Sequence, residues 1–89
     1  MKYEEFVREF KDGRINIKIE NDSNIEKIIN FCYKEGIEYE NVRYAAVDNY
    51  VFCENNILYN TDEYLIDEFS FYGMDELKVD FSMVEKFFK

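Results

Sequence analysis

The strongest constraint on the fold is a change of hydrophobic period at residues 14–20. Ile15, Ile17 and Ile19 alternate there with polar residues, which is the pattern of a β-strand with one buried face and one face in water. The residues on both sides of this stretch follow the spacing of helices instead. A chain that changes period in this way is expected to pack helices against a sheet.

A helix is predicted on the N-terminal side of this strand. Its apolar side chains follow the i, i+3, i+4, i+7 spacing of one helix face: Tyr3, Phe6, Val7 and Phe10. Gly13 is expected to end the helix, because glycine adopts the left-handed conformation at low cost.

A longer helix is predicted on the C-terminal side, from Ser23 to about Glu35. Ser23 and Glu26 are three residues apart, which is the spacing of a capping box. Gly36 is expected to stop this helix. Its predicted core-facing residues are Ile25, Ile28, Ile29 and Cys32.

The middle of the chain predicts short strands joined by tight turns. Residues 37–43 are open between a strand and a connecting loop. Residues 44–47 and 50–53 are β-prone runs. The Asp48-Asn49 pair between them is expected to form a two-residue hairpin turn.

A second turn, a strand and a further helix are predicted next. Residues 54–56 contain two Asn residues, which tolerate positive φ, and a strand should start at 57–59. Asn60 or Thr61 can then cap a helix. The apolar stripe of that helix would be Leu65, Phe69 and Tyr72.

The C-terminal residues predict one more strand and a short helix. Leu77, Val79 and Phe81 alternate with charged residues, as in a strand. Ser82 and Glu85 repeat the capping-box spacing. The residues that this terminal helix should present to the core are Val84, Phe87 and Phe88.

These patterns predict a single α+β domain over residues 1–89. We expect three to four helices packed on a mostly antiparallel sheet of three to five strands. A chain of this size buries only about 60 to 65% of the surface that its unfolded form exposes. The nine Phe and eight Tyr residues supply the bulk that such a small core needs.

The composition argues against membrane, thiol and histidine chemistry. Residues 1–5 contain acids where a signal peptide would need an apolar run, and no stretch of 18 apolar residues exists, so a cytoplasmic location is expected. Cys32 and Cys53 lack C-x-x-C spacing, and the chain has no His, so two buried free thiols are expected.

Catalytic motifs are also missing. Without His, nucleophilic triads of the usual kinds cannot form, and the three glycines are isolated rather than part of a phosphate loop. We therefore predict neither enzymatic activity nor a cofactor. A magnesium or calcium site stays open as an alternative, although the calcium-loop pattern is absent. The carboxylates that would form it are Asp62, Glu63, Asp67 and Glu68.

The negative charge is concentrated in one segment. Residues 44–77 hold eight carboxylates and no Lys or Arg, whereas the chain as a whole has a net charge of -9. Such a surface opposes binding to nucleic acid or anionic membrane, because phosphates must be neutralised by Lys and Arg. The predicted partner is therefore a basic protein surface.

One use for such a segment is imitation of a nucleic-acid backbone. Two acid pairs five residues apart on a helix would be separated by about 7.5 Å along its axis, of the order of the spacing in a row of phosphates. The helix-borne candidates are Asp62, Glu63, Asp67, Glu68, Asp75 and Glu76. The candidates of a second, turn-borne patch are Asp48, Glu54, Asn55 and Asn56.

Several short runs resemble the small acidic phage-encoded anti-CRISPR proteins. These runs are Arg8-Glu9-Phe10-Lys11, Ile15-Asn16-Ile17-Lys18-Ile19, Asp22-Ser23-Asn24, Ile28-Ile29, Asp67-Glu68-Phe69 and Leu77-Lys78-Val79. The resemblance implies a DNA mimic in the host bacterial cell, with acids in the positively charged PAM-reading site of an RNA-guided nuclease. The chain departs from the family pattern at residues 44–59.

Two functions thus remain as hypotheses. The first is an inhibitor that binds a basic nucleic-acid channel of a CRISPR effector by acidic mimicry of DNA. The alternative is a small phage accessory domain for protein interaction, either monomeric or homodimeric, whose acids only keep it soluble.

Overall fold

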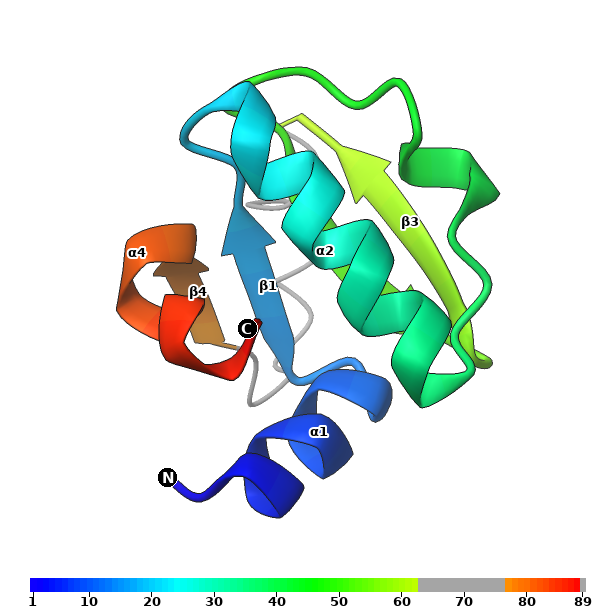
Figure 1. Cartoon of the computed structure of the whole chain (residues 1–89), viewed down its shortest axis with the longest axis vertical. Coiled ribbons are helices and arrows are strands. Elements are labelled where there is room, and N and C mark those ends of the chain that lie inside the picture. Colours follow the sequence, from blue (N-terminus) through cyan, green and yellow to red (C-terminus); the bar gives the residue numbers. More distant parts are fainter. Residues whose placement is uncertain (63–76, 89) are drawn as a thin grey trace.

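The computed structural model describes residues 1–62 and 77–88 (Figure 1). Its elements alternate between helices and strands. In chain order they are α1 (Tyr3–Lys11), β1 (Ile15–Lys18), α2 (Asp22–Glu35), the 3-10 helix η1 (Glu40–Val42), β2 (Tyr50–Glu54), β3 (Ile57–Thr61), β4 (Leu77–Asp80), α4 (Phe81–Val84) and the 3-10 helix η2 (Glu85–Phe87). The predicted α+β class is confirmed.

The described strands form one open, mostly antiparallel sheet, as predicted. Their order is β3-β2-β1-β4, with β2 antiparallel to both β1 and β3 and with β4 parallel to β1. Lys18 at the end of β1 is paired with Tyr50 on one side and with Asp80 on the other. In Figure 1, α2 lies across one face of this sheet.

An aromatic cluster joins three segments that are far apart in sequence. Phe6 of α1 is fully buried and stacks on Phe87, with ring centroids 4.4 Å apart. Phe31 of α2 packs against Phe88 with centroids 4.6 Å apart. Because each ring can bury roughly 150 to 250 Å², these contacts fasten both ends of the chain to α2.

Strand β1 differs from its prediction at one residue. Ile15, Ile17 and Ile19 are buried, as the alternation predicted, but Asn16 on the opposite face is also only 2% exposed. The prediction of a wet face is therefore wrong at Asn16. β1 is an inner strand of the sheet, and the burial of Asn16 means that its second face is also covered at this residue.

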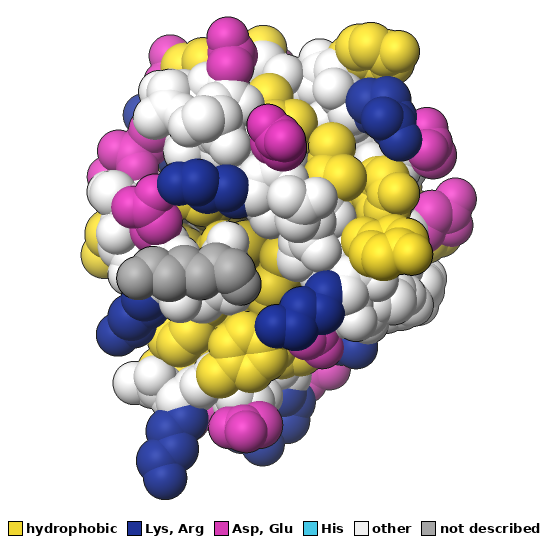
Figure 2. Space-filling view, viewed as in Figure 1, with side chains coloured by type: hydrophobic (Ala, Val, Ile, Leu, Met, Phe, Trp, Pro, Cys, Tyr) yellow, Lys and Arg dark blue, Asp and Glu magenta, His cyan; other side chains and the backbone are white. Residues whose placement is uncertain are grey.

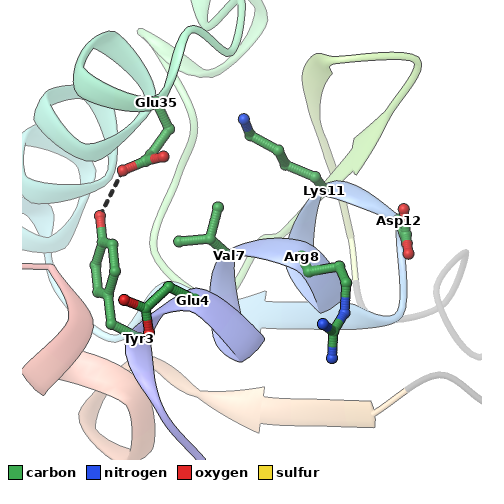
Figure 3. Close-up of a pocket in the computed structure, with 7 residues that line it drawn as sticks. All are labelled: Tyr3, Glu4, Val7, Arg8, Lys11, Asp12 and Glu35. Carbon is green, nitrogen blue, oxygen red and sulfur yellow. Dashed lines mark hydrogen bonds between the residues drawn. The ribbon is translucent and has the colours of Figure 1, made fainter.

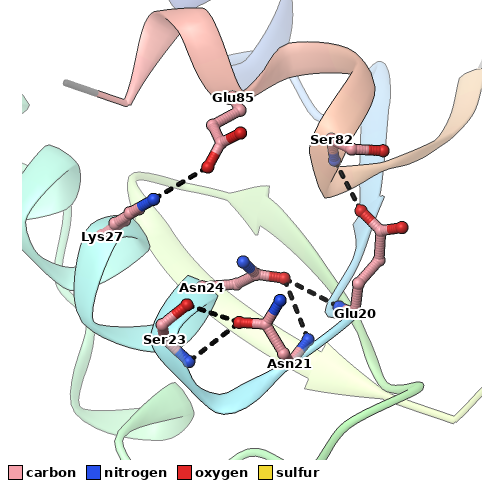
Figure 4. Close-up of polar contacts among 7 residues, drawn as sticks. All are labelled: Glu20, Asn21, Ser23, Asn24, Lys27, Ser82 and Glu85. Atoms are coloured by element: carbon pink, nitrogen blue, oxygen red, sulfur yellow. Dashed lines mark hydrogen bonds and ion pairs between the residues drawn. The ribbon is translucent and has the colours of Figure 1, made fainter.

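Helix α2 begins with a different cap from the predicted one. The capping residue is Asn21, whose side-chain oxygen accepts from Ser23 N–H at 3.1 Å (Figure 4). Asn24 completes the box, because its Oδ1 accepts from Asn21 N–H at 3.1 Å. The predicted Ser23–Glu26 box is wrong, since the amide side chains at 21 and 24 form the box instead. Gly36 ends the helix at φ 74, as predicted.

The core face of α2 is rotated slightly from the predicted one. Ile28 and Cys32 are buried as expected, whereas Ile25 and Ile29 are only partly buried. Phe31 and Asn24 are buried in addition. The aromatic cluster explains the rotation, because it draws Phe31 inward.

The predicted strand at 44–47 is wrong. Tyr44 is 92% exposed and the segment forms turns, with Asn49 N–H donating to the Ala46 carbonyl at 3.1 Å. Asp48 and Asn49 do not join two hairpin strands. Instead, Asp48 N–H donates to the Ile19 carbonyl, and Ile19 N–H donates to the Asn49 carbonyl, both at 2.8 Å.

Residues 37–43, which the sequence left open, form mainly a connection. Glu38 makes one isolated parallel bridge to Ile57, and η1 follows. The predicted β2–β3 hairpin is confirmed, with Glu54 paired to Ile57. Asn55 and Asn56 between them have φ of 54° and 63°, the left-handed values that a two-residue type I′ turn requires.

At the C-terminus, the predicted strand is confirmed as β4, but Phe81 belongs to α4. The Ser82–Glu85 box is wrong, because no side chain at the N-cap Asp80 caps this helix. Glu20 takes that role: its Oε1 accepts from Ser82 N–H at 2.6 Å (Figure 4). The predicted burial of Val84, Phe87 and Phe88 is confirmed.

Asn60 and Thr61, the predicted helix caps, lie in β3, and the helix predicted after them falls outside the described residues. Within residues 1–62 and 77–88, no helix is long and apolar enough to span a bilayer.

The two candidate caps of α2 can be compared directly by mutation. We expect Asn21→Ala to lower the free energy of unfolding by about 1 kcal/mol, because it removes the observed cap. Ser23→Ala should change it by less than about 0.5 kcal/mol. Urea denaturation measures both, and a larger loss for Ser23→Ala would contradict the observed cap.

Candidate partner-binding surface

The strand register gathers carboxylates at one end of the sheet. β1, β3 and β4 all run toward this end, as their arrowheads in Figure 1 show, and β2 starts from it. Thr61, Tyr50, Lys18 and Asp80 form the last row across the four strands. We call this region the acidic end; its exposed carboxylates are Glu20, Asp22, Asp48, Asp62 and Asp80.

The acids of this end follow the order of the strands. Asp62 comes directly after β3, and Asp80 is the last residue of β4, on the opposite edge of the described sheet. Because neighbouring strands lie about 4.8 Å apart, the ends of these two strands are separated by about 14 Å. The carboxylates therefore form a row across the sheet rather than a single cluster.

Asp48 is the best-defined member of the row. Its side chain is 75% exposed, and it faces Lys18 with an Nζ–Oδ1 distance of 3.8 Å. An exposed pair at that distance contributes little to stability. Asp48 also has a φ of 73°, a left-handed conformation that Asp and Asn tolerate better than most other residues with a side chain. The turn therefore accounts for a residue of the Asp or Asn kind here, whereas the negative charge of its exposed carboxylate adds little stability.

Other acids of this end have structural roles as well. Glu20 caps α4 through Ser82, and Asp22 lies in the first turn of α2, where a negative charge suits the helix dipole. Sequence reasoning missed Glu20, Asp22 and Asp80 as site candidates. For Asp80, the missing information was the parallel β1–β4 pairing, which no local pattern encodes and which places Asp80 beside Lys18.

The predicted turn-borne patch is divided by the structure. Asp48 lies at the acidic end, whereas Glu54, Asn55 and Asn56 lie at the opposite end of the β2–β3 ladder. Asn56 has an internal role there, because its amide donates to the Gly36 carbonyl at 2.6 Å. The positive φ values of both Asn residues account for their presence in the turn without any partner.

Of the helix-borne candidates, the structure describes Asp62 alone, and it is exposed. The remaining ones lie outside the described residues: Glu63, Asp67, Glu68, Asp75 and Glu76. Among the described residues, no group of three or more Cys, Asp or Glu side chains is arranged to hold a metal ion.

The helix-covered face has a different character from the acidic end. Figure 2 shows Lys and Arg side chains intermingled with Asp and Glu over this face, together with hydrophobic patches. One example is the Lys27–Glu85 ion pair at 2.8 Å, which joins α2 to η2 (Figure 4). Mixed signs of this kind suit solubility rather than recognition of a single charge.

The two thiols are poorly suited to chemistry. Cys32 and Cys53 are both buried and free. Burial, with a smaller contribution from Cys53, raises the pKa of Cys32 to about 12, and burial also raises the pKa of Cys53. Because the thiolate is the reactive form, both side chains are inert structural residues at neutral pH.

Comparison of the chain with protein-family models, curated proteins and solved structures found no match to any of them. The function is therefore inferred from the chemistry of the protein's surface.

Thiol labelling tests the burial of both cysteines. At pH 8 we expect a disulfide reagent to modify the folded protein at least about a hundredfold more slowly than the protein unfolded in guanidinium chloride. Cys53→Ala should leave one slow thiol in the folded state. Rapid modification of either thiol in the native protein would contradict the assigned burial.

Proposed function

We propose that this protein is an inhibitor that binds a basic nucleic-acid-binding surface through its acidic end, in the manner of a DNA mimic. The observation that carries this proposal is the row of exposed carboxylates that the strand register assembles, with Lys18 as the base in its last row. A basic channel that evolved to hold phosphates would attract such a row, since charge complementarity governs both encounter and orientation.

The proposed target is the DNA-binding channel of a CRISPR effector nuclease. The short runs that resemble small acidic anti-CRISPR proteins support this choice, as does the absence of Lys and Arg from residues 44–62. The other acids named from the sequence, at residues 63–76, lie outside the described residues. In such a target, arginines that otherwise read DNA would contact the carboxylates.

Neutral substitutions at the acidic end test the proposal without changing side-chain shape. We choose the triple variant Asp48→Asn, Asp62→Asn and Asp80→Asn, because Asn tolerates positive φ and helix N-cap positions. The matched control replaces three exposed acids elsewhere by Gln: Glu5, Glu26 and Glu38. Both variants change the net charge equally.

The measurement is inhibition of target-DNA cleavage by a panel of guide-loaded CRISPR nucleases. We expect the acidic-end variant to weaken inhibition by roughly tenfold or more, and the control to stay within about twofold of the wild type. The wild-type affinity should also fall steeply between about 50 and 200 mM salt. Equal weakening by both variants, or no inhibition of any nuclease by the wild type, would overturn the proposal.

One observation favours a second candidate, a protein-interaction domain with merely solubilising acids. Tyr44 is 92% exposed and Tyr33 is 78% exposed, and exposed Tyr side chains are common anchors of interfaces. An apolar interface of this kind would persist at about 0.5 M salt, where an acid-to-base interface is screened. Salt resistance therefore separates the two candidates.

A further inference from the structure

A groove of about 390 Å³ lies between α1 and the C-terminal end of α2 (Figure 3). The side chains of Tyr3, Val7 and Lys11 line it from α1, and Glu35 lines it from α2. Its charges are arranged along α1 with acids toward the start of the helix and bases toward the end. This groove does not belong to the acidic end.

Glu4 and Lys11 mark the two ends of this arrangement. They are seven residues apart, so they lie on one face of the helix about 10 Å apart along its axis, with Val7 between them (Figure 3). Within the described chain, neither side chain makes a hydrogen bond or an ion pair. Both charges are therefore available to a partner.

The negative side of the groove holds a second carboxylate. Tyr3 donates its hydroxyl hydrogen to Glu35 Oε2 at 2.6 Å. Burial, together with this bond, raises the pKa of Tyr3 to about 12, so the phenol keeps its proton and holds Glu35 in place. Glu4 and Glu35 thus face the same region of the groove (Figure 3).

At the other side, two further charges accompany Lys11. Arg8 lies one turn earlier and pairs only loosely with Glu9, at 3.9 Å. Asp12 follows Lys11 at the end of the helix and also lines the groove. The net result is a helix face that is negative near its N-terminus and positive in its last turn.

Such a face is complementary to a copy of itself that runs in the opposite direction. We propose that two copies of this protein associate through α1 about a two-fold axis, with Glu4 of each copy opposite Lys11 of the other. The axis then passes between residues 7 and 8, so Val7 meets the aliphatic stem of the second copy's Arg8. Antiparallel helix dipoles also favour this arrangement. Every contact is made twice, as a two-fold interface requires.

The dimer would leave the acidic end free. In Figure 1, α1 lies at the opposite end of the molecule from the arrowheads of β1 and β3. The two acidic ends would therefore point away from each other. The net charge of -9 on each copy opposes association, so the dimer should form only at high protein concentration.

Charge exchange provides a direct test by analytical ultracentrifugation. We expect the wild type to reach twice its monomer mass of 10.9 kDa as concentration rises. Glu4→Lys and Lys11→Glu should each weaken this self-association by roughly tenfold or more, because like charges then face each other at both contacts. An equimolar mixture of the two variants should form a heterodimer, because both contacts become attractive again.

The matched control is Glu5→Lys. It makes the same change of charge in the same turn of α1 as Glu4→Lys, but Glu5 does not line the groove. It should dimerise like the wild type, and circular dichroism should show that all variants remain folded. Heterodimer formation in the mixture would support the proposal even if the single variants lose some stability. A monomeric wild type at every concentration, or a mixture no more associated than its separate components, would overturn it.

Discussion

The pairing of β1 on both sides is the constraint on which the rest of the structure depends. Ile17 is fully buried and is paired with Val51 on one side and with Val79 on the other. The pairing of β1 with β2 positions the β2–β3 hairpin in the sheet. The pairing of β1 with β4 brings the C-terminal segment back beside the N-terminal half of the chain. The acidic end and the aromatic cluster both follow from this return of the chain.

The features that could be predicted from the sequence are those encoded by local spacing. The alternating isoleucines predicted β1, and the paired Asn residues predicted the β2–β3 turn, because period and positive φ are properties of a few neighbouring residues. Gly36 was predictable as a helix stop for the same reason. The general α+β class followed from the succession of these local patterns.

The features that could not be predicted depend on contacts between distant residues. The burial of Asn16 does not follow from the alternation within β1, and Ser82 of α4 is capped by Glu20, which lies 62 residues earlier in the chain. Residues 44–47 have β-prone side chains, but they form turns, and the next two residues, Asp48 and Asn49, bond to the distant backbone of Ile19. The same limit applies to the acidic end. Asp48 and Asp62 could be named from the sequence because they lie in the acid-rich segment 44–77, whereas Asp80 could be placed only from the parallel pairing of β1 with β4.

The two proposed contacts use different patterns of charge, which lie at opposite ends of the protein. At the acidic end, exposed carboxylates predominate and suit a basic partner, although Glu20 and Asp22 also stabilise helix starts. Along α1, opposite charges are separated on one helix face and suit a second copy. The helix-covered face between them has mixed signs and fits neither use.

Amide hydrogen exchange, measured on the protein bound to a CRISPR nuclease that it inhibits, tests the central claim most directly. If the acidic end contacts the nuclease, exchange should slow at residues 46–50, 60–62 and 80–82 and stay unchanged in α1. Slowed exchange confined to α1 and α2, with the strand ends unaffected, would contradict the claim that this row of carboxylates is the binding surface.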